Sequence, residues 1–438
     1  MAARLMKKLA QGALLAAASQ AIALSAGAAW VQAAEVVVWG WQQNADLWKD
    51  VEKVLQARGE DVTIQYRASD PQQYGAILQS ALTGGGGPDV FAIGASAPAP
   101  YKFIAAGQLE PLDSIIDRSL IDEKYFDFST ADGVNYGVPF ALLTIQWYYN
   151  QDMFAEAGLE PPKTWEDLVK VAEAFKAKGI IPIAAMGQGA YGQASINWSA
   201  EALSASLLGR EFIADIVARK KDFTDERFVT FLTKLKELTN YYQPNWQASG
   251  SSGTEMQTLF TTDQAAMTVS GLWDVALNFN KMNPDLNVGS FLTPTLTAGE
   301  TPYIDYIIDG VFSMRSGIDD PAERKSTEAV IKFTSTKEFG DMYAKANSAI
   351  SPITGVVNPD EHPVVSQSRD WLTCCGAPDL LGTGSPFMEP PLSTGSDVAA
   401  YDSVQSVAWT VLPPMMRGEI TPEQAAQQFQ ERLGWYFK

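Results

Sequence analysis

The chain has 438 residues, of which 46% are hydrophobic and 19% are charged, which suffices for the cores of two domains. It carries 51 Asp and Glu against 32 Lys and Arg, a net charge of -19. Such an acidic chain is a poor partner for nucleic acid or an anionic membrane, so we expect neither.

The first 33 residues have the pattern of a secretory signal peptide. Basic residues precede an uncharged stretch rich in Ala and Leu, and small residues at 31 and 33 suit cleavage after Ala33. A membrane anchor is the alternative, because the stretch is about as long as a spanning helix. It is rich in Ala, Gly and Ser, however, and is interrupted by Gln20. We therefore expect residues 1–33 to be removed and the protein to be secreted.

The following segment alternates strands with helices. Strands are expected at 35–41, 62–66 and 88–93, and helices at 46–58 and 72–82. This order predicts a parallel sheet. Ligands of such sheets bind beyond the carboxyl ends of the strands. That rule places Trp41, Gln42 and Ser96 at one crevice.

A long apolar strand, 138–149, then leads into a helix that begins at Thr164. Thr164 and Asp167 form a variant capping box, with Asp in place of Glu or Gln. A buried strand that runs directly into a new helix suggests that the chain leaves one layered unit and enters another.

The remaining elements continue the α/β pattern. Further strands are expected at 182–186, 265–270, 288–292 and 307–314, and further helices at 199–208, 225–242, 320–334 and 423–433. Residues 188–197 show no period and are expected to form a loop. Asp320 and Pro321 are a strong helix start.

Cysteine and histidine are scarce. Cys374 and Cys375 are adjacent and are the only two cysteines, so the choice is a vicinal disulfide or two buried thiols, and the sequence leaves both open. Two adjacent thiols and the single His362 do not make a zinc site, and we expect no metal or cofactor. A catalytic triad would need His362, which lies in a polar loop without a nucleophile elbow elsewhere. Glycoside hydrolysis by two carboxylates from Asp274, Asp305 and Asp309 is the enzymatic alternative.

Tryptophans lie near the ends of expected strands or in loops. Indole stacks on the flat C–H faces of sugars, while amides and carboxylates bond their hydroxyls. Trp39 and Trp41 point to opposite faces of one strand, and we expect Trp41 in the cleft and Trp39 in the core. Trp198 and Trp273 are expected to contact ligand, whereas Trp147, in mid-strand, is expected to pack in the core.

Several motifs in series carry a family resemblance. The chain resembles the periplasmic sugar-binding proteins of ABC importers, the group that includes maltose-binding protein, over nearly all of its mature length. The matching motifs are Gly87–Phe91, Ala106–Leu109, Val138–Phe140, Tyr149–Asp152, Ala157–Leu159, Pro162–Asp167, Ala265–Met267 and Gly271–Trp273. The chain departs from the pattern at Asp309-Gly310, where the family often has Gly-Gly, and from Cys374 to Ser396.

The resemblance implies an α/β, two-lobed periplasmic-binding-protein fold. Each lobe would be a mostly parallel sheet flanked by helices, and the lobes would be joined by three crossings. The first lobe would comprise 34–141 and 288–327, and the second 142–287 and 328–438. The first crossing would bend within 141–144.

The resemblance also implies a non-enzymatic function. The protein would be the soluble component of an ABC transport system, a periplasmic monomer that binds a sugar or short oligosaccharide between closing lobes and delivers it to the membrane permease. A polyol or sugar acid as ligand, or a secreted carbohydrate hydrolase, is the alternative. The expected ligand contacts are Trp41, Gln42, Ser96, Trp198, Trp273, Asp274, Tyr303 and Asp309.

Overall fold

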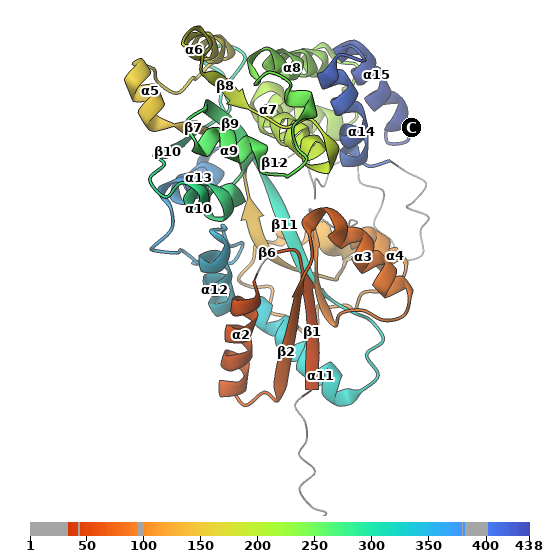
Figure 1. Ribbon diagram of the computed structural model, residues 1–438. Coiled ribbons are helices and arrows are strands. Elements are labelled where there is room, and N and C mark those ends of the chain that lie inside the picture. Colours follow the sequence, from red (N-terminus) through yellow and green to blue (C-terminus); the bar gives the residue numbers. More distant parts are fainter. Residues whose placement is uncertain (1–33, 43, 95–99, 379, 382–401) are drawn as a thin grey trace, which may run out of the picture.

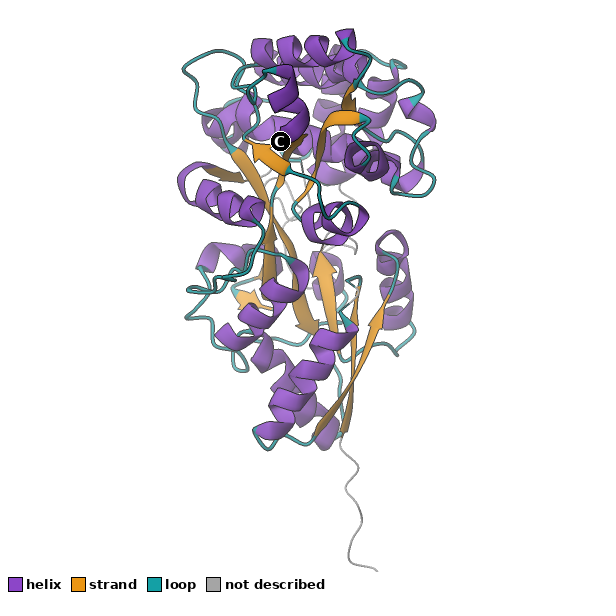
Figure 2. Ribbon diagram, turned by 60° about the vertical axis from the view of Figure 1, so that its left-hand side comes forward, coloured by secondary structure: helices purple, strands orange, loops and turns teal. Residues whose placement is uncertain are grey.

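The computed structural model describes residues 34–42, 44–94, 100–378, 380–381 and 402–438. The chain forms two lobes, each around its own sheet (Figure 1). Helices surround the strands of each lobe (Figure 2). The expected signal peptide and Ser96 lie outside the described residues. Among the described helices, none combines the length and apolar character that a membrane crossing requires.

The first lobe contains a mixed sheet with the strand order β12-β11-β3-β1-β2, in which β6 also pairs with β11. The strands are β1 (Ala34–Gly40), β2 (Val62–Ala68), β3 (Val90–Gly94), β6 (Val138–Leu143) and β11 (Ile304–Met314), with β12 (Gly376–Pro378) paired to the end of β11 that lies in the second lobe. Neighbours β2, β1 and β3 are parallel, while β11 runs antiparallel to β3 and β6. The helices of this lobe are α2 (Ala45–Ala57), α3 (Pro71–Thr83), α4 (Pro100–Ala105), α11 (Pro321–Thr334) and α12 (Lys337–Asn347).

The second lobe contains a sheet with the order β10-β7-β9-β8. Its strands are β7 (Ile145–Asn150), β8 (Ile181–Ala184), β9 (Ala265–Gly271) and β10 (Val288–Phe291). Its helices are α5 (Gln151–Ala157), α6 (Trp165–Ala177), α7 (Gly189–Val217), α8 (Glu226–Glu237), α9 (Glu255–Thr261), α10 (Asn280–Met282), α13 (Pro363–Cys375), α14 (Val404–Arg417) and α15 (Pro422–Arg432).

The two-lobed α/β fold is confirmed, but the sheets are mixed rather than mostly parallel. In the second sheet β7 pairs antiparallel with both β9 and β10, and only β8 and β9 are parallel. The reason is the route of the chain. Strand β7 enters from the first lobe and runs away from it, whereas β9 runs back toward it.

Two expected lobe boundaries differ from this arrangement. Strand β10 was expected in the first lobe, but its residues Val288–Phe291 pair with β7 of the second sheet. Residues 328–347 were expected in the second lobe, but α11 packs on β1, β3 and β11, and α12 packs on α2 and β6. The sequence of an apolar strand or an amphipathic helix shows which face is buried, but it does not show which of two sheets that face will pack against. The lobe of each segment could therefore not be read from its own pattern.

Within the described residues the chain passes between the lobes three times. The first crossing leads from β6 through Thr144 to β7, the second is the long strand β11, and the third is 348–362, between α12 and α13. A backbone hydrogen bond from Leu142 N to Ile350 O at 2.7 Å ties the first crossing to the third, and one from Leu272 N to Thr144 O at 3.0 Å ties the first crossing to the turn after β9. The strand break at Thr144 falls inside the expected bending region.

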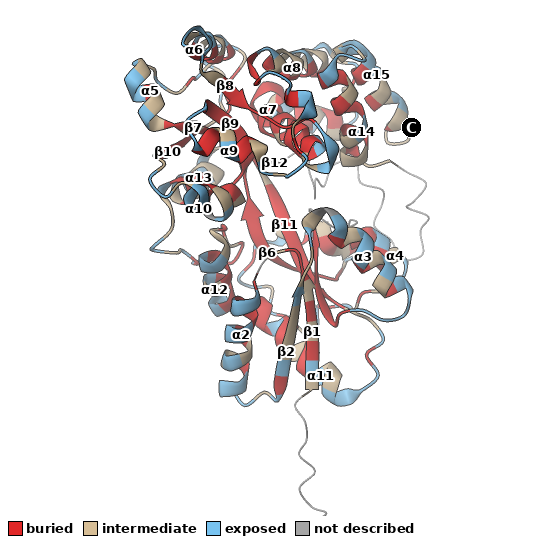
Figure 3. Ribbon diagram, viewed as in Figure 1, coloured by how far each residue is buried: buried red, intermediate tan, exposed pale blue. Residues whose placement is uncertain are grey.

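The core follows the strands. Figure 3 shows β6 and β11 buried along most of their length, while the outer faces of α2 and α6 are exposed. Trp147 is fully buried and stacks on Phe291 at 5.6 Å, which confirms its packing role. The capping box of Thr164 and Asp167 and the cap at Asp320 are also confirmed.

Helix α7 is the main error in the predicted secondary structure. It begins at Gly189, runs through the rest of 188–197, the expected loop, and is kinked at Gly209. Residues 194–197 are buried together with most of the following turns. A helix buried around most of its circumference has no amphipathic period, so the pattern that announces surface helices is missing.

The adjacent cysteines form a disulfide at the end of α13. Cys374 and Cys375 are bonded to each other, with their Cα atoms 3.8 Å apart. The structure therefore selects the vicinal disulfide from the two alternatives that the sequence left open.

Candidate functional site

The carboxyl ends of the parallel strands in the two lobes face each other. In the first sheet, Gly94 at the end of β3 pairs with Gly310, on the side from which β11 arrives out of the second lobe. In the second sheet, Gly271 at the end of β9 pairs with Ile145, the first residue after the crossing. The residues that follow β1, β2, β8 and β9 therefore lie at the junction of the lobes, where a ligand of an α/β fold is expected.

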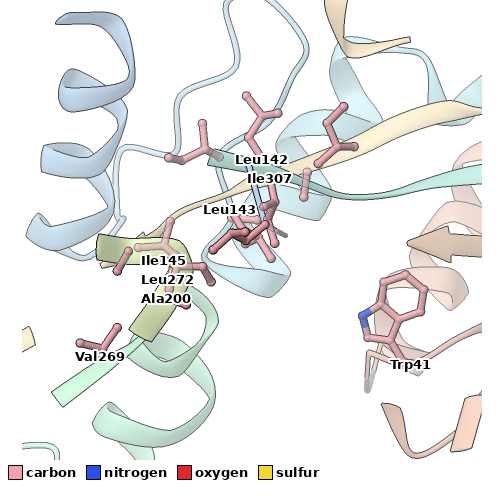
Figure 4. Packing of buried hydrophobic residues seen from close by; sticks show 14 of the residues in the cluster. Trp41, Leu142, Leu143, Ile145, Ala200, Val269, Leu272 and Ile307 are labelled. Atoms are coloured by element: carbon pink, nitrogen blue, oxygen red, sulfur yellow. The ribbon is translucent and has the colours of Figure 1, made fainter. Parts of the chain in front are cut away.

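Trp41, which follows β1, belongs to a group of aromatic residues in the first lobe. Its ring lies 5.4 Å from that of Tyr74 and 6.0 Å from that of Phe140. Figure 4 shows Trp41 set apart from the crossing residues Leu142 and Ile307, with its indole nitrogen on the side facing them. Trp41 is only 9% exposed, whereas Trp39 is half-buried. Burial thus reverses the expected order of these two tryptophans.

Gln42 and Asp309 form a polar pair beside this group. Gln42 Nε2 donates to Asp309 Oδ2 at 3.1 Å, and the hydroxyl of Tyr66 donates to Gln42 O at 2.7 Å. Burial raises the pKa of Asp309 to about 7, and the hydrogen bond from Gln42 opposes part of that rise. Burial and the nearby charge of Asp309 also raise the pKa of Tyr343. The expected contacts Gln42 and Asp309 are thereby brought together on one lobe.

In the second lobe, Trp198 and Trp273 form an edge-to-face pair. Their ring centroids are 5.3 Å apart, with an interplanar angle of 63°. Trp198 comes from α7 and Trp273 from the turn after β9, and both are half-buried. The ring of Trp273 folds back over Gly271, where a Cβ atom would lie 2.0 Å from it. The pair joins two expected contacts that are far apart in sequence and leaves part of each indole accessible.

Asp274 was expected to contact ligand, but the structure places it below the surface. Its side chain is fully buried and accepts hydrogen bonds from Ser270 Oγ at 2.5 Å, Gln257 Nε2 at 3.0 Å and Asn278 Nδ2. Burial raises its pKa, and the three donors oppose that rise. The contacts of Asp274 thus hold the turn that carries Trp273, and we leave it out of the site.

Replacing Asp274 with alanine is expected to cost about 3 kcal/mol of stability, because three donors lose their acceptor inside the protein. Chemical denaturation measures the loss. Asp50→Ala, at an exposed position on α2, is the control and is expected to change stability by about 0.5 kcal/mol or less. Equal stability of Asp274→Ala and the wild type would contradict this structural role.

Tyr303 lies apart from the other expected contacts, in a pocket of about 420 Å³ on the second lobe. The guanidinium group of Arg210 lies 4.8 Å from the centre of the Tyr303 ring. The hydroxyl of Ser206 donates to Tyr303 O and accepts from Tyr303 N. A second pocket of about 580 Å³ lies between α5 and the segment 283–287. Neither pocket is lined by the tryptophans described above.

Two residues at the junction were missed from the sequence. Asp70 follows β2, and Tyr191 lies in the first turn of α7. The hydroxyl of Tyr191 donates to Asp70 Oδ2 at 3.3 Å, so this bond joins the lobes. The strand-end rule that selected Trp41 would also have selected Asp70. Tyr191 lies in 188–197, which was expected to be a loop, so its position on a helix could not be used to place its side chain.

His362, Asp274 and Asp305, which were considered as catalytic groups, are held in the interior or at a helix end by contacts within the protein. His362 Nδ1 accepts a hydrogen bond from Val364 N at 3.2 Å and caps α13, and burial lowers its pKa. Asp305 is fully buried within β11, and Asp274 is fully buried in the turn after β9. Asp309 is the one of the three candidate carboxylates that we keep in the site.

Comparison with protein families matches residues 40–339 to the model of the bacterial extracellular solute-binding protein family. The chain is 22% identical over 351 residues to the multiple sugar-binding protein of Streptococcus mutans serotype c, covering 75% of this chain and 81% of that protein. It is 28% identical over 151 residues to the arabinooligosaccharide-binding protein of Halalkalibacterium halodurans, covering 32% and 33% of the two chains.

Solved structures share the fold. A chitin oligosaccharide binding protein superposes with a TM-score of 0.75 at 24% identity, covering 93% of this chain and 99% of that one. A bacterial solute receptor described as having an exclusive preference for β-D-galactopyranose superposes with a TM-score of 0.74 at 16% identity, covering 92% and 99%. At these identities the similarity establishes a shared two-lobed architecture.

Proposed function

Because the chain belongs to the family of bacterial extracellular solute-binding proteins, we propose that it binds a sugar or short oligosaccharide between its lobes and delivers it to the permease of an ABC transporter. The family is one of binding proteins that act outside the cytoplasm. The relatives named above bind sugars or oligosaccharides according to their names. The finer proposal is a periplasmic monomer, secreted through a cleaved signal peptide.

The observation that carries the proposal is the Trp198–Trp273 pair at the carboxyl end of the second sheet. An accessible indole offers a flat apolar face that suits the C–H face of a pyranose and excludes water from it. The two indole planes meet at 63°, so together they form an angled apolar surface instead of a flat one. Such a surface suits a compact, rigid ring better than an extended peptide.

The first lobe supplies the polar partners. Gln42 is an amide with donor and acceptor atoms, and Asp309 is an adjacent carboxyl group whose pKa of about 7 lets it accept or donate a hydrogen bond. Sugar hydroxyls need both kinds of partner. Trp41 lies next to Gln42 and is mostly buried, so only the small exposed part of its indole ring can contact a ligand.

The mechanism follows from the placement of these groups on separate lobes. A sugar that touches Trp273 and Gln42 at once stabilises only the arrangement in which the lobes are close. Binding therefore shifts the population toward the closed form. The crossings at Thr144 and in β11 supply the joint, and the closed surface is what a permease would recognise.

The first experiment is a thermal-shift screen over mono- and oligosaccharides, with polyols and sugar acids included. A ligand that binds only the native state raises the melting temperature. The best ligand is then incubated with the protein, and the mixture is analysed for cleavage products. A saccharide that binds and stays intact supports the proposal, whereas released products would support the hydrolase alternative.

Trp273→Ala is expected to weaken saccharide affinity by roughly 30-fold, about 2 kcal/mol, since it removes a stacking face and the support of Trp198. Trp435→Ala removes a half-buried tryptophan near the C-terminus and is the matched control, with unchanged affinity expected. Isothermal titration calorimetry measures both. Wild-type affinity in folded Trp273→Ala would remove the tryptophan pair from the site.

A further inference from the structure

The bond between Asp70 and Tyr191 joins the lobes away from the crossings. Asp70 follows β2 and begins α3, where its backbone oxygen accepts from Gln73 N at 3.0 Å and Tyr74 N at 2.9 Å. Tyr191 belongs to α7 of the other lobe. Their side chains meet at 3.3 Å between the tyrosine hydroxyl and the carboxylate. The two ends of this bond are therefore held by different rigid bodies.

Both residues are in register with the candidate site. Tyr74, one helical turn beyond Asp70, touches Trp41 and donates its hydroxyl to Ala92 O at 2.8 Å. Tyr191 lies seven residues before Trp198, which places the two side chains on the same face of α7. The bond thus bridges the helix that backs Trp41 and the helix that carries Trp198.

Tyr191 is fixed on its own lobe. The backbone amides of Gly187 and Gln188, just before α7, both donate to Ser249 O, at 2.9 and 2.8 Å. Burial, followed by the charge of Asp70, raises the pKa of Tyr191, so that its hydroxyl keeps the proton that it donates. A fixed donor on one lobe and a helix-start carboxylate on the other can meet only while the lobes are close.

We propose that Asp70 and Tyr191 form a latch that holds the two lobes together in the ligand-free protein and thereby raises affinity for the proposed saccharide. The proposal has two halves: the latch holds the lobes together, and it raises saccharide affinity. Only the second half rests on the proposed function. The latch favours the arrangement that a ligand needs, and apparent affinity scales with the fraction of molecules already in that arrangement. An exposed hydrogen bond of this length contributes little, so an effect of up to about threefold on affinity is expected.

Interlobe distance tests the first half without any ligand. Spin labels are attached to cysteines introduced as Lys53→Cys on α2 and Lys170→Cys on α6, both exposed positions on opposite lobes. The two natural cysteines are bonded to each other. With Tyr191→Phe the distance distribution is expected to shift to longer values. Tyr436→Phe, whose hydroxyl bonds Val217 O within the second lobe, is the control and is expected to match the wild type.

A double-mutant cycle separates the latch from local effects. Asp70→Ala also alters the start of α3, but that loss is the same with or without the Tyr191 hydroxyl. If the latch exists, Tyr191→Phe lengthens the interlobe distance in the Asp70 background and has no further effect once Asp70 is alanine. A Tyr191→Phe distribution identical to the wild type, or equal shifts in both backgrounds, overturns the proposal.

Affinity tests the second half. Titration with the saccharide found by thermal shift is expected to show up to about threefold weaker binding by Tyr191→Phe, and wild-type binding by Tyr436→Phe. Unchanged affinity despite a longer ligand-free distance overturns the link to binding. If the wild type binds no saccharide at all, the proposed function fails, while the ligand-free distances still decide whether the latch exists.

Discussion

Replacing Gly94 with alanine is expected to destabilise the protein by about 3 kcal/mol or more, the cost of forcing apart a packed sheet. Gly94 ends β3 and pairs in register with Gly310 of β11. A Cβ atom on Gly94 would lie 2.0 Å from Asp309 O and 2.6 Å from Gly310 Cα, and backbone atoms cannot rotate away. The strands must therefore separate where they carry Asp309.

Thermal and urea unfolding measure this loss. Gly86→Ala is the matched control, because no atom lies within 4 Å of the added methyl group. It is expected to unfold as the wild type does, or at slightly higher denaturant, since alanine restricts the unfolded chain. A Gly94→Ala protein as stable as Gly86→Ala would mean that the approach of β3 and β11 is not needed.

A second large effect is expected at Asp309, where burial raises the pKa from 3.8 to about 7. Between these values the native state keeps a proton that the unfolded state releases. Stability is therefore fully present below about pH 4, is lost as pH rises toward 7, and levels off above it. A difference of three pKa units corresponds to about 4 kcal/mol. Asp309→Asn keeps the shape and an acceptor for Gln42, but it cannot ionise.

The expected result is that Asp309→Asn does not lose stability in this way as pH rises and is more stable than the wild type by up to about 4 kcal/mol at pH 8. Urea unfolding at pH 5 and pH 8 gives the difference for each protein. Asp50→Asn, at an exposed carboxylate of α2, is the control and should keep the wild-type pH dependence. If Asp309→Asn and the wild type change equally between the two pH values, Asp309 does not titrate as the structure implies.

Both effects arise at Asp309-Gly310, where the resemblance leads us to expect Gly-Gly. Gly310 supplies the close approach to β3, and Asp309 places a titratable group at the junction beside Gln42. The departure was visible in the sequence. Its consequence, a carboxylate buried against the amide of Gln42 just after β1, depends on two residues that are 267 positions apart in the sequence.

Local signals in the sequence were sufficient for most elements and for the family. Thr164 and Asp320 cap helices because their side-chain oxygens accept from amides two or three residues away, so the interaction is contained in the pattern itself. The strand-end rule selected Trp41 and Gln42 in the same way, whereas Asp309 was expected from the family resemblance. The rule follows the direction of each strand, which an alternation of strand and helix already implies.

The tertiary structure decided what depends on distant partners. Asp274 follows β9 as Trp41 follows β1, but donors from α9 and the next turn bury it, and only packing reveals them. Strand β10 joins the second sheet because it pairs with the edge of β7. Tyr191 reaches Asp70 because its segment is the first turn of α7, a helix that the sequence pattern did not reveal. Periodicity reports which face of an element meets solvent, so it fails where every face is covered and where the choice lies between two sheets.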